Sequence, residues 1–205
     1  MAENSINEYL VDLQWPEPNE RLFEGGSPCH FNAIPSWGSA ISFDTVARHY
    51  WTAAVSLSES VASEAVMLDA VIRPIVFVYR QCLELKIKGI IELDFKLDGE
   101  AFPYARYMHH RLSVLWSDAK QRLKKRLGRD APKELAYIDP CIKEFEQHDP
   151  QSFAFRYPTD KDGKMCLTEI RYIHLGRLHE TMKRIHSLLD SMAWCLGAMR
   201  DQRAE

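Results

Sequence analysis

The chain has 205 residues, of which 46% are hydrophobic and 27% are charged, and its formal net charge is -3. This length suits one domain, or one domain with an arm, and the composition is that of an ordinary soluble globular protein. The slightly negative charge excludes a global attraction to nucleic acid, although local basic patches could still bind it.

The five cysteines are odd in number, widely spaced and never arranged as a C-x-x-C pair. This pattern argues against a disulfide framework or a zinc knuckle and favours a reducing, cytosolic setting. No apolar run is long enough to cross a bilayer, and the acidic, polar start of the sequence is unlike a secretory signal. We therefore expect a soluble, cytoplasmic protein without membrane association.

Residues 1–41 are predicted to form a mostly non-helical arm. Four prolines and three glycines interrupt the first 40 residues, but large apolar side chains such as Trp15, Phe23 and Trp37 are frequent there. This composition favours an ordered arm that wraps across the rest of the protein or across a partner subunit. Acidic residues outnumber basic ones in it, so the arm could cover a basic surface or form a solvated edge.

Residues 42–205 are predicted to fold as an all-α, up-and-down bundle of four to five helices. Capping residues, apolar spacing and turn signals together delimit the helices. We expect helices at 42–64, 67–95, 109–127, 132–147 and 168–200. Proline interrupts two of them: Pro74 predicts a kink or a break, and Pro140 predicts a bend.

The stretch 74–93 is apolar on nearly every side, as is typical of the central helix of a bundle. Within it, Arg80, Glu84 and Lys88 follow one another at one-turn intervals on the same face. Charges in such a helix are rarely left unpaired. The three residues could form a structural ladder at the edge of the bundle, or they could point into a shared groove.

The last predicted helix carries a heptad pattern of apolar residues. Its members are Leu175, Leu178, Met182, Ile185, Leu189, Met192, Leu196 and Met199. Such a seam packs lengthwise, either inside the bundle or across a homodimer.

Three short motifs resemble the HEPN superfamily. They are the run 79–86 (YRQCLELK), the start His110-Arg111-Leu112, and the segment 156–160 (RYPTD). The resemblance covers about residues 44–200. It implies a bundle of four or five helices, frequent homodimerisation, and roles in RNA cleavage, toxin-antitoxin pairs and defence against phage.

Active HEPN ribonucleases carry Arg and then His, four to six residues apart, on a late helix, and this sequence lacks that spacing. It offers Arg171 and His174, which would share a helical face with Leu178. These residues could serve a metal-independent nuclease, with Arg171 binding phosphate and His174 transferring a proton. Alternatively, they cap and solvate the last helix.

The end of the third predicted helix is the strongest basic feature. Its six cations are Lys120, Arg122, Lys124, Lys125, Arg126 and Arg129. They could bind the phosphates of RNA or DNA, or they could form a solvated or partner-facing surface. Further along the chain, Arg156 lies among aromatic residues. It could pair with a carboxylate such as that of Glu84, or it could hold a phosphate or carboxylate ligand.

Motifs for metals and cofactors are absent from the sequence. The neighbours His109 and His110 lack chelating spacing, His179-Glu180 does not continue as a zinc motif, and no phosphate-binding glycine loop occurs. We therefore expect no metal and no cofactor. The sequence favours a binding or regulatory module that contacts RNA, DNA or an acidic protein partner, in a bacterial stress or phage-defence system. A divergent ribonuclease and a purely structural interaction subunit are the alternatives.

Overall fold

The computed structural model describes residues 21–35 and 41–204, which belong to two units, Met1–Ala40 and Ile41–Glu205. In the first unit, the short 3-10 helix η1 (Cys29–Phe31) lies within a loop. The Asn32 side chain closes this loop, because it accepts a hydrogen bond from Gly26 N and donates one to Gly26 O. The other residues of the predicted arm, 1–20 and 36–40, lie outside the described residues, so its wrapping stays a prediction.

The second unit is an all-α bundle, which confirms the predicted fold class. Its helices are α2 (Phe43–Ala62), α3 (Leu68–Leu97), α4 (Tyr104–Tyr107), α5 (Leu112–Leu127), η2 (Gly128–Asp130), η3 (Lys133–Ile138), α6 (Asp139–His148) and α7 (Leu175–Ala204). No β-strand occurs in the described ranges, where Thr159 and Met165 form an isolated bridge. Likewise, no helix in these ranges is long and apolar enough to cross a bilayer.

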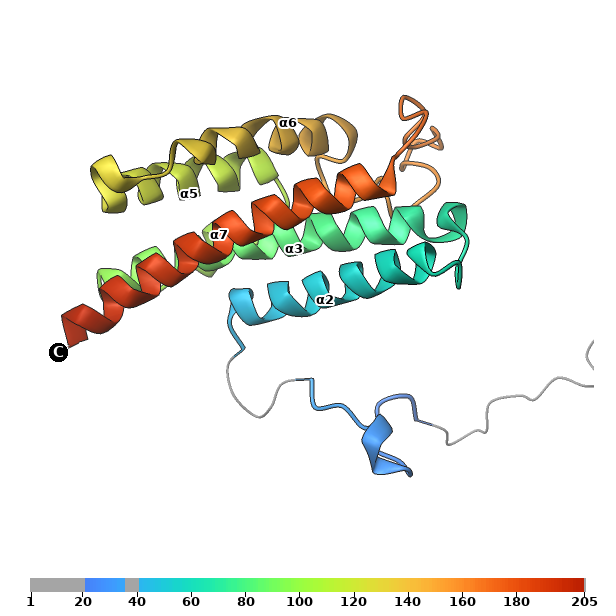
Figure 1. Ribbon diagram of the computed structural model, residues 1–205, viewed down its shortest axis with the longest axis horizontal. Helices are drawn as coiled ribbons and strands as arrows, with labels where there is room; N and C mark the ends of the chain where they lie inside the picture. The colour runs from blue at the N-terminus through green and yellow to red at the C-terminus, as the bar shows by residue number, and fades with distance from the viewer. Residues whose placement is uncertain (1–20, 36–40, 205) are drawn as a thin grey trace, which may run out of the picture. The chain divides into compact units, whose positions relative to one another are not determined.

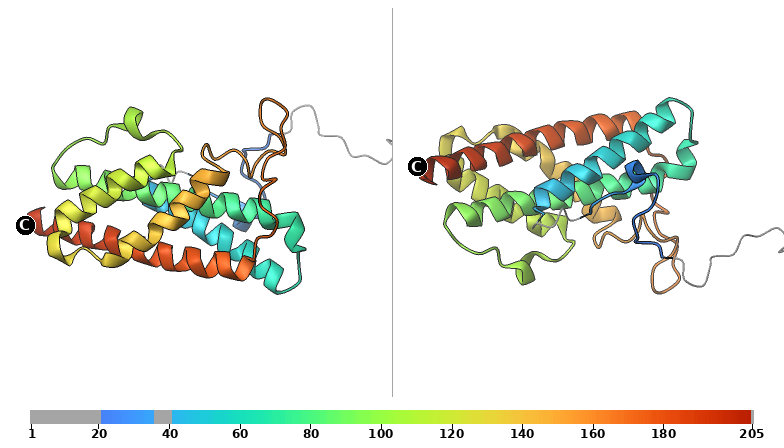
Figure 2. Two further views of the ribbon diagram at one scale, coloured as in Figure 1. Left: turned by 90° about the horizontal axis from the view of Figure 1, so that it is seen from above. Right: turned by 90° about the horizontal axis from the view of Figure 1, so that it is seen from below.

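Helix α3 is the centre of the bundle and contacts α2, α7 and α5 (Figures 1 and 2). Helix α5 runs parallel to α3, because the long connection through α4 carries the chain back before α5 begins. Two contacts show this direction. Arg80 in α3 binds the carbonyl of His110 just before α5, and Arg126 near the end of α5 pairs with Asp98 just after α3.

The heptad seam of α7 is buried within the chain. Met182, Ile185, Leu189, Met192 and Leu196 all belong to the main hydrophobic core, and α7 packs along α3. Burial of these side chains removes apolar surface from water inside one subunit. The seam therefore closes the bundle itself.

Several helix boundaries differ from the predicted ones. Helix α7 begins at Leu175 instead of residue 168, and α5 begins at Leu112 instead of residue 109. Pro140 was expected to bend a helix, but it lies in the first turn of α6. At that position the absent N–H costs no helical hydrogen bond. Pro74 lies inside α3, which continues through it without a break. Packing of α3 against several helices offsets the hydrogen bond that this proline cannot make.

Candidate functional site: a groove beside the start of helix α7

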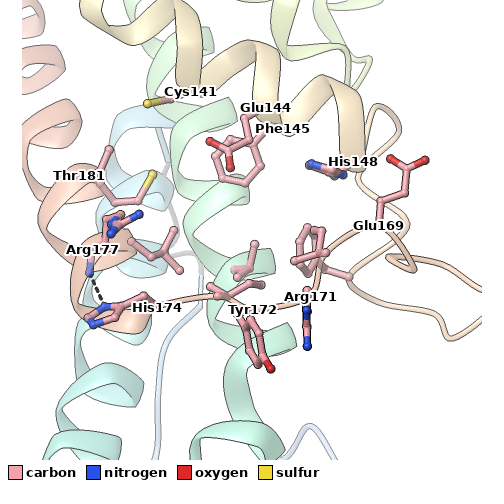
Figure 3. Close-up of a pocket in the computed structure, with 16 residues that line it drawn as sticks. Cys141, Glu144, Phe145, His148, Glu169, Arg171, Tyr172, His174, Arg177 and Thr181 are labelled. Carbon is pink, nitrogen blue, oxygen red and sulfur yellow. Dashed lines mark hydrogen bonds between the residues drawn. The ribbon is translucent and has the colours of Figure 1, made fainter.

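A groove of about 590 Å³ lies between α6, α7 and the segment that precedes α7 (Figure 3). Its volume is in the range of sites for small ligands. Its apolar lining comes from Val76, Cys141, Phe145, Phe155, Ile170, Ile173, Leu178 and Met182. Its polar lining comes from Glu144, His148, Glu169, Arg171, Tyr172, His174, Arg177 and Thr181. The site thus combines an apolar floor with groups of both charges.

The predicted pair Arg171 and His174 does line this groove, but not from a helix. Residues 171–174 have no regular secondary structure, so the expectation that Arg171, His174 and Leu178 share a helical face is wrong. Instead, His174 caps α7: its Nδ1 accepts a hydrogen bond of 3.2 Å from the backbone N–H of Arg177. This bond satisfies one of the unpaired N–H groups of the first helical turn, which explains the late start of α7.

The cap also determines the protonation pattern of the His174 ring. Because Nδ1 accepts a hydrogen bond, the neutral ring carries its proton on Nε2. A side chain on Gly176 would approach the His174 ring to 3.2 Å, so glycine leaves room for the imidazole at this turn. His174 thus combines a cap on α7 with a place in the lining of the groove.

Two arginines supply the positive charges of the groove, whose lining also includes Glu144 and Glu169. The guanidinium of Arg171 lies over the ring of Tyr172, 5.3 Å from the ring centroid, and Arg177 extends from the first turn of α7. Neither forms an ion pair within the part of the chain that the structure describes. His148 and Glu169 lie at one end of the groove and His174 lies at the other (Figure 3).

Half of the predicted basic cluster on α5 is bound in ion pairs. Lys120 contacts Asp139 at 2.5 Å, and Arg122 and Arg126 contact the two carboxylate oxygens of Asp94 at 2.6 and 2.5 Å. Arg126 also bonds to Asp98 and thereby holds the pKa of that carboxyl below its usual range. These three cations join α5 to α3 and α6.

The other three cations, Lys124, Lys125 and Arg129, are exposed. Within the described residues, no hydrogen bond or ion pair is formed by their side chains. The six predicted residues therefore divide into a structural half and a solvent-facing half.

The ladder of Arg80, Glu84 and Lys88 is fully buried instead of lying at the bundle edge. Arg80 contacts Glu84 at 3.2 Å, Lys88 contacts the same carboxylate at 2.7 Å, and His110 Nδ1 lies 3.0 Å from it. Arg80 Nε also donates a hydrogen bond of 3.2 Å to the backbone carbonyl of Asp149. The network joins α3 to the start of α5 and to the end of α6.

Arg156 does not pair with Glu84. Its Nε donates a hydrogen bond of 2.7 Å to the carbonyl of Ser152, and its guanidinium lies over the rings of Phe77 and Tyr157. The guanidinium is exposed. It is therefore held by aromatic rings and open to an anionic ligand.

Sequence reasoning did not include His148, Arg177 or Tyr172 in the candidate site. Arg177 could have been found, because it lies one turn from His174 on α7. His148 is the last residue of α6, and nothing in the sequence indicates that this end of α6 faces the start of α7. Across residues 21–35 and 41–204, no group of three or more possible metal ligands is close enough to hold an ion.

The fold and the groove together define an all-α helical bundle with a groove that has apolar, cationic and acidic lining residues. Comparisons of the chain with protein-family models, curated proteins and solved structures find no match.

Proposed function

We propose that this protein is a nucleic-acid-binding module, and that the groove beside α7 is its main contact site. The observation that carries this proposal is the gathering of Arg171, Arg177, His148 and His174 over one apolar floor. Guanidinium groups without ion-pair partners bind phosphate through several N–H donors, and an apolar floor accepts a base or a ribose.

The exposed cations of α5 supply a second, purely electrostatic contact in this proposal. Lys124, Lys125 and Arg129 lie at or just after the end of α5, where no carboxylate of residues 21–35 or 41–204 forms an ion pair with them. Recognition by such a surface is independent of sequence and weakens with salt. Homodimerisation and a setting in bacterial stress or phage defence are proposed from the HEPN resemblance alone.

The test is binding of labelled single-stranded RNA in EDTA at several salt concentrations. The double variant Arg171→Gln and Arg177→Gln should weaken binding and reduce the salt dependence. Each lost phosphate contact lowers the slope of log K against log salt by about 0.7. The triple variant Lys124→Glu, Lys125→Glu and Arg129→Glu should weaken binding less.

A matched control removes two charges from the exposed turn after Tyr157, through Lys161→Gln and Lys164→Gln. This control should bind as the unmodified protein does. If the Arg171→Gln and Arg177→Gln double variant binds RNA as tightly as the unmodified protein, the proposed contact site is overturned. Absence of any salt-sensitive binding by the unmodified protein would overturn the proposed function and favour a structural interaction subunit.

A metal-independent ribonuclease is the second candidate, and the presence of Arg171 and His174 in the groove favours it. His174 would take the proton of the ribose 2′-hydroxyl as its oxygen attacks phosphorus. A water molecule would protonate the departing 5′-oxygen as the P–O bond breaks, which leaves a 2′,3′-cyclic phosphate. Arg171 would stabilise the charge that develops on the phosphate.

The same incubation in EDTA tests this candidate. Cleavage by the unmodified protein that is lost in His174→Ala would support it. Intact RNA in the presence of binding would reject catalysis and leave the binding module.

A further inference from the structure

Two Arg-Tyr dipeptides share an unusual arrangement at the groove. Arg156-Tyr157 and Arg171-Tyr172 each place the guanidinium over the neighbouring tyrosine ring, at 5.5 and 5.3 Å from the ring centroid. The tyrosine is accessible in both pairs, with 46% of Tyr157 and 82% of Tyr172 exposed. Each pair therefore presents an aromatic ring and a cation together to solvent.

A third pair shows that the arrangement alone does not create such a surface. Arg106 lies 5.3 Å from the centroid of the Tyr107 ring, but Tyr107 is only 3% exposed and belongs to the core. In that pair the ring has a structural role. Exposure distinguishes the two pairs at the groove from the buried one.

One exposed pair lines the groove, and the other follows directly in sequence after a residue that lines it. Arg171 and Tyr172 line it directly, and so does Phe155, which immediately precedes Arg156. Two residues of extended chain span at most about 7 Å, so Tyr157 is close to the groove-lining Phe155.

The Tyr157 pair is held firmly in place. The Phe153 and Tyr157 rings stack with centroids 4.5 Å apart, so Phe153 covers one face of the Tyr157 ring and a base would stack on the Arg156 side of this pair. Arg73 donates hydrogen bonds to the carbonyls of Ala154, Phe155 and Tyr157, and Asp149 accepts bonds from the N–H groups of Phe153 and Ala154. A surface that is fixed before binding loses little conformational entropy when a ligand arrives.

We propose that these two pairs are stacking platforms for unpaired bases, so the ligand class is single-stranded nucleic acid instead of duplex. This inference rests on the proposed function. Unpaired bases stack on exposed aromatic rings and on the planes of arginine guanidinium groups, whereas the bases of a duplex are already stacked on one another. Stacking does not involve the 2′-hydroxyl, so single-stranded RNA and DNA of one sequence should bind similarly.

The test compares binding of a labelled strand of about 12 nucleotides with binding of its duplex, by fluorescence anisotropy. The single strand should bind more tightly than the duplex. Tyr157→Leu and Tyr172→Leu should each weaken single-strand binding by about 5-fold to about 150-fold, and leave duplex binding unchanged. Leucine keeps an apolar side chain but removes the ring face.

Tyr137→Leu is the matched control. Tyr137 is 72% exposed on η3, and no ring or cation pairs with it in the described ranges. Its replacement should leave binding unchanged.

Failure of this inference is distinguishable from failure of the proposed function. Unchanged binding in both tyrosine variants, or equal binding of duplex and single strand, would overturn the stacking platforms. The proposed function would still stand if the Arg171 and Arg177 variant lost affinity in the same assay.

Discussion

The imidazole of His186 on α7 stacks on the indole of Trp51 on α2, with ring centroids 4.2 Å apart. Its Nδ1 lies 3.3 Å from Asp190 Oδ2, whereas its Nε2 is buried without a hydrogen-bond partner in the described structure. Burial lowers the pKa of His186 below the ordinary value for histidine, and the nearby Asp190 carboxylate opposes this effect. The other charges that act on this ring come from Asp44, Arg48 and Lys86. The folded protein therefore favours the neutral imidazole.

This geometry predicts a loss of stability in acid. Since the pKa of His186 is lower in the folded than in the unfolded chain, the unfolded chain binds more protons as the pH falls below about 6.5. The variant His186→Phe keeps a ring on Trp51 but cannot titrate. Its melting temperature should fall less than that of the unmodified protein between about pH 7 and about pH 5, measured by circular dichroism. Parallel curves for the two proteins would contradict the prediction.

Arg80 should be among the most sensitive positions in the bundle. The change Arg80→Met leaves the buried Glu84 and Asp149 carboxylates without their guanidinium partner. Loss of one partner from a buried ion pair costs about 3–5 kcal/mol of unfolding free energy, which urea denaturation measures. Arg129→Met, at an exposed site, should change it by less than about 0.5 kcal/mol. Similar values for the two variants would show that the buried network contributes little.

Lys86 should contribute less than Arg80, although it is equally buried. Its ammonium donates hydrogen bonds to Asp44 on α2 and Asp190 on α7 and thereby joins helices that otherwise share few contacts. Both carboxylates are partly exposed and can regain water when the ammonium is removed. We expect Lys86→Met to cost about 1.5–3 kcal/mol in urea denaturation. A loss as large as that of Arg80→Met would contradict this role for solvent.

Leu189 tests whether the α7 seam closes within one subunit. Leu189→Ala removes a fully buried side chain and should cost about 2–5 kcal/mol, whereas Ser187→Ala, on the exposed face of α7, should have little effect. Because the seam is intramolecular, the loss should not depend on protein concentration. A loss from Leu189→Ala that changes with protein concentration would instead indicate that subunits share the seam.

The periodic elements were predictable from the sequence, and their ends were less so. The heptad residues of α7 and the apolar α3 are buried in the core because apolar spacing alone determines which face of a helix packs. The start of α7 depends on the side-chain cap of His174, and histidine is not a strong capping signal. Pro74 predicts a kink or a break from local rules, and α3 continues through it without a break.

The candidate site was predictable only in part. Arg171 and His174 lie close in sequence, so the sequence alone identified them as a candidate pair, and both line the groove. The division of the basic cluster was not predictable, because Asp94 and Asp98, which bind Arg122 and Arg126, come from the end of α3. Which cations remain for a ligand depends on how α5 packs against α3.

The hydrogen bonds that Arg73 donates to the 154–157 backbone have a kinetic consequence. A loop that must order itself around each ligand slows association, because only a fraction of encounters meet the competent form. The three bonds hold the backbone beside the groove-lining Phe155 in one conformation before any ligand arrives. The rate constant of association should therefore follow diffusion and ionic strength, and differences in affinity between ligands should arise in their residence times.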